Sequence, residues 1–104
     1  MGMWLRVCAV GDLMPERVTR FEAGDTTYTI VRVADGTYYA LEGYCTHERT
    51  LLADGLVTGF DLECPAHFGA FDVRTGEAVV PPACIDLRSY PVKVEAGEVF
   101  IAVD

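Results

Sequence analysis

Several residue types are scarce or missing in this chain of 104 residues. It has no Asn or Gln, one Lys against seven Arg, and two His. No apolar run approaches the roughly 20 residues that a transmembrane helix needs, which excludes such a helix. The first six residues also lack the basic region, the long apolar segment and the cleavage site of a secretory signal. We therefore expect one cytoplasmic domain that spans residues 1–104 and has no membrane partner.

Basic side chains are few as well. Eight Lys and Arg stand against sixteen Asp and Glu, which gives a net charge of −8. Nucleic acids and anionic membranes are bound through basic patches, so this composition argues against both, and we expect neither as a partner. The same acidity favours a protein partner with a basic docking face.

The chain has four cysteines, Cys8, Cys45, Cys64 and Cys84. Thiols stay reduced in the cytoplasm, so metal ligands are favoured over two disulfides. Cys8 and Cys84 lie in apolar or Pro-rich surroundings with no His nearby, and we expect both to be buried and unreactive. We also expect Trp4 in the core. Cys45 and Cys64 are the candidate ligands.

Gly and Pro punctuate the chain at short intervals, and the segments between them are rich in Val, Ile, Tyr, Phe and Thr. No stretch of ten or more residues has helical periodicity. The expected strands are residues 4–10, 17–22, 28–33, 37–42, 60–64, 70–73, 88–94 and 99–103. Apolar and polar residues alternate from Phe60 to Cys64, which predicts that Cys64 points inward. The sequence thus predicts an all-β, antiparallel sandwich or barrel.

Each of the two histidines closely follows a cysteine. The first pair is Cys45-Thr46-His47, and Cys64-Pro65-Ala66-His67 follows after sixteen residues. Two Cys and two His can bind zinc or hold an iron–sulfur cluster. Structural zinc fingers usually pair like ligands within a loop, whereas each loop here supplies one Cys and one His. The mixed pairs favour a [2Fe–2S] cluster with both thiolates on one iron and both imidazoles on the other.

These motifs resemble the Rieske signature, Cys-X-His followed by Cys-X-X-His. Further likeness to the small Rieske ferredoxins lies in residues 4–10, 54–57, 71–76 and 90–95. The resemblance implies a Rieske-type β-sandwich or barrel with a small cluster-binding subdomain. Two loops within about residues 43–69 would form that subdomain. It also implies that the cluster ligands are Cys45, His47, Cys64 and His67.

The resemblance also implies a function. Ferredoxins of this kind pass electrons from a flavoprotein ferredoxin reductase, fed by NAD(P)H, to a terminal Rieske non-haem iron oxygenase that hydroxylates aromatic rings. The chain shows no nucleophile–base pair and no Gly-rich phosphate motif, which favours a one-electron carrier over an enzyme. We also expect the protein to be a monomer. Two alternatives stay open. One is a zinc-binding interaction module, and the other is the Rieske subunit of a non-oxygenase system such as a nitrite reductase.

The chain departs from the respiratory Rieske proteins, which carry a second Cys in each ligand loop and a Ser and a Tyr that donate hydrogen bonds to the cluster. Residues 45–52 and 64–71 contain no second Cys, and residues 68–71 contain no hydroxyl. Hydrogen bonds to cluster sulfur stabilise the reduced state, so without them we expect a potential near about −150 mV, at the low end of the Rieske range.

Four more residues are expected near the cluster. Rieske folds cover the cluster with a third loop that contains proline, and the resemblance assigns Pro81 and Pro82 to that loop. Phe68 follows His67 and is predicted to contact a partner. Glu48 follows His47 and is predicted to influence which partner is chosen.

Overall fold

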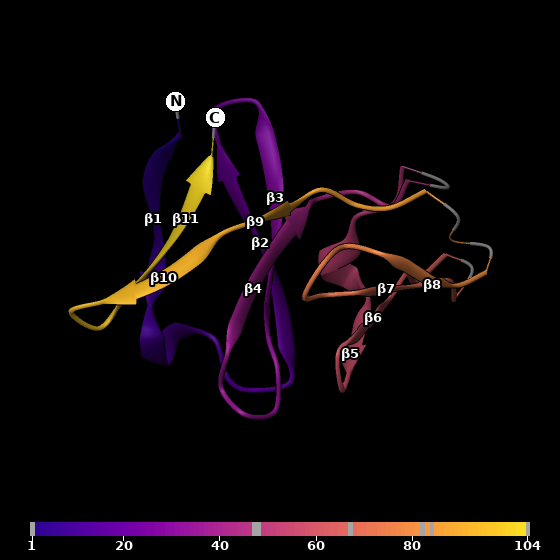
Figure 1. The fold of residues 1–104 in the computed structure, drawn as a ribbon, viewed down its shortest axis with the longest axis horizontal. Coiled ribbons are helices and arrows are strands. Elements are labelled where there is room, and N and C mark those ends of the chain that lie inside the picture. Colours follow the sequence, from indigo (N-terminus) through magenta and orange to yellow (C-terminus); the bar gives the residue numbers. More distant parts are fainter. Residues whose placement is uncertain (1, 47–48, 67, 82, 84, 104) are drawn as a thin grey trace.

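The computed structural model describes residues 2–46, 49–66, 68–81, 83 and 85–103. In this part of the chain three antiparallel sheets form, with strand orders β1-β11-β10, β2-β3-β4-β9 and β5-β6-β7-β8 (Figure 1). The strands are β1 Met3–Ala9, β2 Arg17–Ala23, β3 Thr26–Arg32, β4 Tyr38–Glu42, β5 Leu56–Thr58, β6 Asp61–Glu63, β7 Ala70–Asp72, β8 Ala78–Val80, β9 Ser89–Tyr90, β10 Val92–Glu95 and β11 Glu98–Val103. The described residues form no α-helix, only two short 3₁₀ turns. None of these turns is long and apolar enough to span a membrane.

The second sheet is the middle layer, and its strand β3 is buried on both faces. Side chains alternate across a strand, so neighbouring residues face opposite layers. Ile30 belongs to an apolar cluster with Ile101 of the first sheet, and Val31 to a second cluster with Leu62 of the third sheet. Burial on two sides explains residues 27–31 of this strand, Thr-Tyr-Thr-Ile-Val, which are all aromatic or β-branched.

The structure confirms the predicted all-β class and corrects parts of the strand assignment. Residues 88–94 are two strands, because β9 pairs with β4 whereas β10 pairs with β11. Pro91 lies between them, and its missing N–H suits the point where the chain leaves one sheet for another. Strands β5 and β8 were not predicted. With β6 and β7 they give the predicted two-loop subdomain a sheet of its own.

The third sheet and the loops that leave it form one end of the molecule. In Figure 1 they lie on the right, while β1 and β10 of the first sheet lie on the left. The segments that carry the two Cys-His motifs are therefore at the end opposite to the first sheet.

Candidate metal centre

Cys45 lies in a loop that follows β4 and turns back on itself. Tyr44 and Leu51 form an isolated β-bridge, and the Cys45 N–H donates to the Thr50 carbonyl at 2.9 Å. Before the bridge, Gly43 passes so close to the second sheet that a Cβ there would lie 2.5 Å from the Thr27 oxygen. Glycine is therefore required at this position. The loop holds Cys45 buried, with 4% of its surface exposed.

Cys64 occupies the matching place in a second loop, directly after β6. Its N–H donates to the Gly69 carbonyl at 2.8 Å, and its own carbonyl accepts from the Phe68 N–H at 3.0 Å. Both cysteines thus bond to the carbonyl five residues further along. Leu62 and Cys64 are each fully buried, as the alternation from Phe60 to Cys64 predicted. Pro65 then fixes the direction in which the chain leaves Cys64.

A third loop, after β8, packs against both of these loops. The Thr46 hydroxyl donates to the Ile85 carbonyl at 2.5 Å. A Cβ added to Gly69 would lie 2.8 Å from the Ala83 nitrogen, so the second and third loops meet backbone to backbone. The Asp86 carboxylate accepts from the Ala78 N–H at 2.9 Å and closes the base of the third loop.

The structure brings together the predicted ligands that it describes. Cys45, Cys64 and Ala83 belong to one apolar cluster. The other two predicted ligands, His47 and His67, lie outside the described residues. Among the residues that the structure describes, no three His, Cys, Asp or Glu side chains gather as a metal site. Two buried cysteines in neighbouring loops fit the thiolate half of an iron–sulfur donor set.

Four further residues were predicted to lie near the cluster, and the structure describes two of them, Phe68 and Pro81. Phe68 is 66% exposed, and its backbone has a φ of 61°, a conformation that L side chains rarely adopt. Pro81 is exposed on the third loop. Pro82 and Glu48 lie outside the described residues.

Cys8 and Cys84 were not predicted as ligands, and the structure describes only the first of them. Cys8 is half-buried, not fully buried, and Cys84 lies outside the described residues. Burial raises the pKa of the Cys8 thiol, and the Asp12 carboxylate adds to this shift. A raised pKa keeps the thiol protonated, so the expected low reactivity of Cys8 agrees with its surroundings.

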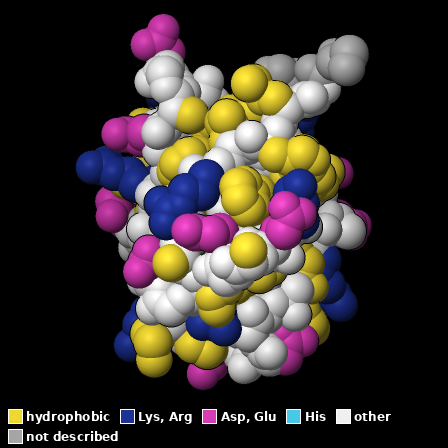
Figure 2. All heavy atoms as spheres, turned by 90° about the vertical axis from the view of Figure 1, so that its left-hand side faces the viewer, with side chains coloured by type: hydrophobic (Ala, Val, Ile, Leu, Met, Phe, Trp, Pro, Cys, Tyr) yellow, Lys and Arg dark blue, Asp and Glu magenta, His cyan; other side chains and the backbone are white. Residues whose placement is uncertain are grey.

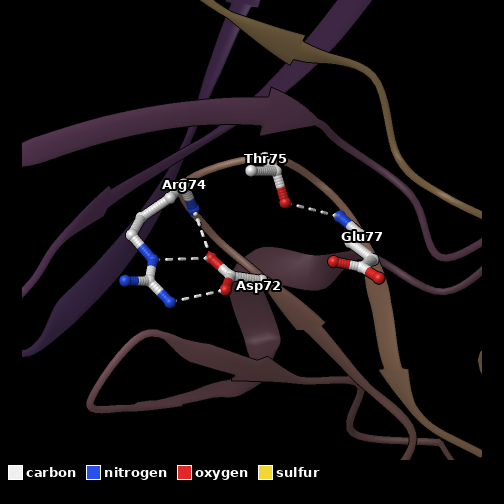
Figure 3. A network of polar contacts seen from close by, with 4 residues as sticks. All are labelled: Asp72, Arg74, Thr75 and Glu77. Carbon is white, nitrogen blue, oxygen red and sulfur yellow. Dashed lines mark hydrogen bonds and ion pairs between the residues drawn. The ribbon is translucent and has the colours of Figure 1, made fainter.

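A network of polar and aromatic contacts fixes the turn after β7 against the second sheet. Arg74 forms an ion pair with Asp72, while Thr75 accepts from the Glu77 N–H at 3.2 Å (Figure 3). The Arg74 guanidinium carbon also lies 4.0 Å from the centre of the Phe60 ring, which meets the ring of Tyr39 edge to face. This stack connects the third sheet to β4 of the second.

Sequence reasoning missed part of the surface around the two loops. Val79, Val80 and Ile85 are exposed, although all three are apolar. A sequence signal that could have identified them is the lack of charged residues in their segment. Residues 78–85 contain no charged side chain, as is also true of residues 64–71.

Comparison with known proteins places the chain in a family. The family model of the Rieske [2Fe-2S] domain matches residues 3–91. Ferredoxin CarAc of Metapseudomonas resinovorans is 39% identical over 101 residues, which cover 96% of this chain and 94% of that protein. The ferredoxin component of the p-cumate 2,3-dioxygenase system of Pseudomonas putida is 36% identical over 98 residues, covering 93% of this chain and 83% of that protein.

A solved structure agrees with these relatives. In the complex of reduced oxygenase and oxidised ferredoxin of carbazole 1,9a-dioxygenase, one chain matches with 38% identity and a TM-score of 0.89, over 95% of this chain and 92% of that one. The chain therefore belongs to the Rieske [2Fe–2S] family, whose cofactor is the [2Fe–2S] cluster. Within that family it is a ferredoxin component of an aromatic-ring-hydroxylating dioxygenase system, an electron-transfer protein and not a catalyst. This confirms the predicted ferredoxin over both alternatives.

Proposed function

We propose that the cluster ligands are Cys45 and Cys64, which share one iron, and His47 and His67, which share the other. The observation that carries this proposal is the matched setting of the two cysteines. Each is buried in the same apolar cluster, and each closes a loop by donating to the carbonyl five residues on. Each also has a histidine two or three positions later. Such a set supplies the two thiolates and two imidazoles of a Rieske centre.

The bound cluster supplies a centre that accepts and releases one electron. Around it, the chain's own residues exclude water and set the surroundings of the sulfur atoms. The only side-chain hydroxyl between Cys45 and His47 is that of Thr46, and it donates to the Ile85 carbonyl. Ala70 and Phe71, which follow the second loop, are buried and have no hydroxyl. A low reduction potential is consistent with these surroundings.

The third loop completes the surroundings of the cluster in this proposal. Ala83 packs on Gly69 and places the loop against the second ligand loop. We assign Pro81 and Pro82 to the cover of the cluster, Phe68 to contact with a partner, and Glu48 to the choice of that partner.

The proposed electron path runs from an NAD(P)H-dependent flavoprotein ferredoxin reductase, through this protein, to a terminal Rieske non-haem iron oxygenase. A similar ferredoxin has been solved in complex with an oxygenase, which supports the second half of that path. The proposal includes a single domain over residues 1–104, a monomer, and a cytoplasmic location in which the ligand thiols are kept reduced. It includes no nucleic-acid or membrane partner, in keeping with the net charge of −8.

Alanine substitution tests the ligand assignment. We expect Cys45→Ala, Cys64→Ala, His47→Ala and His67→Ala each to reduce iron and acid-labile sulfide to below about a tenth of wild type, because a cluster with three protein ligands is not retained. Cys8→Ala is the matched control, since its half-buried thiol lies in the other apolar cluster. Iron, sulfide and the visible spectrum are measured on protein purified without oxygen. A normal Rieske spectrum in any of the four variants would refute the assignment of that residue.

A further inference from the structure

Arg49 lies inside the first ligand loop and stacks on an aromatic ring of the same loop. Its guanidinium carbon is 4.4 Å from the centre of the Tyr44 ring. Tyr44 directly precedes Cys45, and its β-bridge to Leu51 closes the base of the loop. An exposed arginine ordinarily samples many rotamers, whereas attraction to a ring favours one position of its charge. The stack therefore keeps a positive charge close to a proposed cluster ligand.

The hydrogen bonds of the loop limit how far Arg49 can lie from Cys45. The Cys45 N–H donates to the Thr50 carbonyl at 2.9 Å, and Arg49 directly precedes Thr50. Standard bond lengths then put the Arg49 Cα at most roughly 9 Å from the Cys45 nitrogen. The Leu52 N–H also donates to the Gly43 carbonyl at 2.9 Å, which closes the loop a second time. Cys45 and Arg49 are thus neighbours in space as well as in sequence.

The charge of Arg49 contrasts with the acidic segment in which it lies. Residues 43–87 carry seven acids and two bases. The other base, Arg74, forms an ion pair with Asp72 at 2.8 Å. Among the residues that the structure describes, no carboxylate forms an ion pair with Arg49. Its positive charge is therefore available to interact with another group near the loop.

Two acids lie near Arg49 without neutralising it. Asp25 and Glu42 line, together with Arg49 and Tyr44, a hollow with a volume of about 250 Å³. The Glu42 carboxylate accepts from the Arg88 N–H at 2.5 Å, so it is already engaged by a backbone amide. Asp25 lies in the turn between β2 and β3. Water and salt screen charges that are not in direct contact, so these acids weaken the positive charge of Arg49 but do not cancel it.

Reduction changes the charge of the proposed centre by one unit. One electron enters from the donor, so the reduced form is one charge more negative than the oxidised form. A nearby positive charge interacts more favourably with the more negative form. Arginine stays protonated at every working pH, so this contribution does not depend on its titration. Loss of the charge should therefore make the centre harder to reduce.

We propose that Arg49 raises the reduction potential of this ferredoxin, and that Tyr44 is the positioning residue that holds the guanidinium in place. This inference rests on the proposed function, because Cys45 is one of the proposed ligands. The acids of residues 43–87 favour the oxidised form, and Arg49 opposes them. A higher potential favours electron uptake from the reductase and disfavours delivery to the oxygenase, so Arg49 adjusts the balance between the two steps.

Potentiometric titration of the holoprotein tests the role of Arg49. Dithionite supplies electrons through mediators at about pH 7 and about 20 mM salt, and visible absorption reports the reduced fraction. We expect Arg49→Gln to lower the equilibrium constant for reduction about threefold to tenfold, which corresponds to a potential lower by about 30–60 mV. At about 500 mM salt we expect less than half of this shift, because ions screen an exposed charge. Arg49→Lys keeps the charge and should recover most of the wild-type potential.

Two substitutions of Tyr44 with different expected results test the positioning role. Tyr44→Phe keeps the ring under the guanidinium, so we expect the wild-type potential. Tyr44→Leu removes the ring and frees Arg49 to extend into solvent, so we expect a smaller shift in the same direction as that of Arg49→Gln. Adding Tyr44→Leu to Arg49→Gln should cause no further shift, because the ring acts through the guanidinium.

Lys93→Gln is the matched control for the loss of one positive charge. The Lys93 ammonium lies 4.6 Å from the centre of the Trp4 ring, so it is also a cation stacked on an aromatic residue. Lys93 belongs to the first sheet, at the end of the molecule opposite to the ligand loops. The face at that end mixes basic, acidic and apolar side chains (Figure 2). We expect Lys93→Gln to leave the potential unchanged.

Three results would overturn the proposal. One is a wild-type potential in Arg49→Gln at low salt, in protein with a wild-type visible spectrum. Another is a shift in Lys93→Gln as large as that in Arg49→Gln. The third is a shift in Tyr44→Phe as large as that in Tyr44→Leu, because the hydroxyl and not the stacked ring would then be responsible. Failure of the proposed function is a different observation, since wild-type protein would then lack a Rieske spectrum in solution.

Discussion

Asp72 receives three hydrogen bonds from a single neighbour. The Arg74 backbone N–H and its Nε donate to Oδ1 at 2.8 and 3.1 Å, and its Nη2 donates to Oδ2 at 2.8 Å (Figure 3). The bonds from the guanidinium hold the pKa of Asp72 below its ordinary value, although partial burial opposes the shift. Asp72 and Arg74 are two residues apart in a turn of the backbone. The turn brings the backbone N–H and the guanidinium of Arg74 to the same carboxylate.

This pair predicts a specific pH dependence of stability. A carboxyl group whose pKa is lower in the folded than in the unfolded chain adds stability above the unfolded value of about 3.9, and that stability is lost as the pH falls through the folded value. Asp72→Asn should therefore lower the melting temperature at pH 7, by about 5 °C or less for a pair at the surface. It should also flatten the loss of stability below about pH 4. Calorimetric melts from pH 3 to 7 measure both. A constant difference between variant and wild type over that range would contradict the account.

Single residues differ in how well the sequence predicted them. The alternation along β6 predicted an inward Cys64, and this is confirmed because one face of that strand is buried. The prediction that Trp4 lies in the core is wrong, since the residue is 45% exposed. Trp4 pairs with Ala102 on the outer face of the first sheet, where Lys93 covers its ring. Periodicity locates a strand, but which face meets the core depends on pairing partners far away in sequence.

At the scale of elements, the turn from β7 to β8 depends on a glycine. Gly76 has a φ of +86°, and a Cβ there would lie 2.1 Å from the Leu87 oxygen. The Leu87 N–H also donates to the Gly76 carbonyl at 2.8 Å. The turn is thus fixed against the segment that leads from the third sheet back to the second.

Substitution at this turn should be far more harmful than at a comparable open turn. We expect Gly76→Ala to cost at least about 3 kcal/mol, because the strained φ and the backbone clash add together. Gly59→Ala is the matched control, with a φ of +60° and no atom within 4 Å of its added Cβ, and should cost about 1 kcal/mol. Urea unfolding of the two variants measures the difference. Equal urea midpoints for the two variants would contradict this, because they would show that the backbone at Leu87 moves away from the added Cβ at little cost in free energy.

The strands that the sequence predicted are mostly those with long alternating patterns. Strands β5 and β8 have three residues each and were missed. Strand β6 is equally short, but the alternation from Phe60 to Cys64 extends beyond it on both sides and predicted it. Residues 88–94 show one continuous pattern, yet β9 and β10 belong to different sheets. Short strands and changes of sheet are decided by tertiary packing, so local sequence does not reveal them.

A hydrogen bond from Thr46 to Ile85 joins the first and third loops at the proposed cluster. Thr46→Val removes the hydroxyl that donates to the Ile85 carbonyl and keeps the shape of the side chain. A lost hydrogen bond of about 0.5–1.5 kcal/mol should let the loops open more often and speed loss of iron about threefold to tenfold. Thr46→Ser should behave like wild type. The decay of visible absorbance with excess chelator measures the rate. Equal rates in both variants would exclude this role of the hydroxyl.

For the whole molecule, the sequence predicted the class of fold but not the three layers. The four cluster ligands stay a prediction. The layers depend on burial of β3 on both sides, which places one apolar cluster against the first sheet and another against the third. The cluster against the third sheet contains Cys45 and Cys64, so the proposed metal site is an extension of the core. The place of the charge was equally hidden, because the sequence shows that residues 43–87 carry seven acids and two bases but not that these residues lie at the end opposite to the first sheet.

In the proposed role, this protein carries one electron on a low-potential [2Fe–2S] cluster. A potentiometric titration of the purified holoprotein, followed by visible absorption without oxygen, tests it most directly. We expect a brown protein that shows a single one-electron transition at about −150 mV. A colourless zinc protein with no transition, or a transition near about +300 mV like that of hydrogen-bonded Rieske centres, would contradict it.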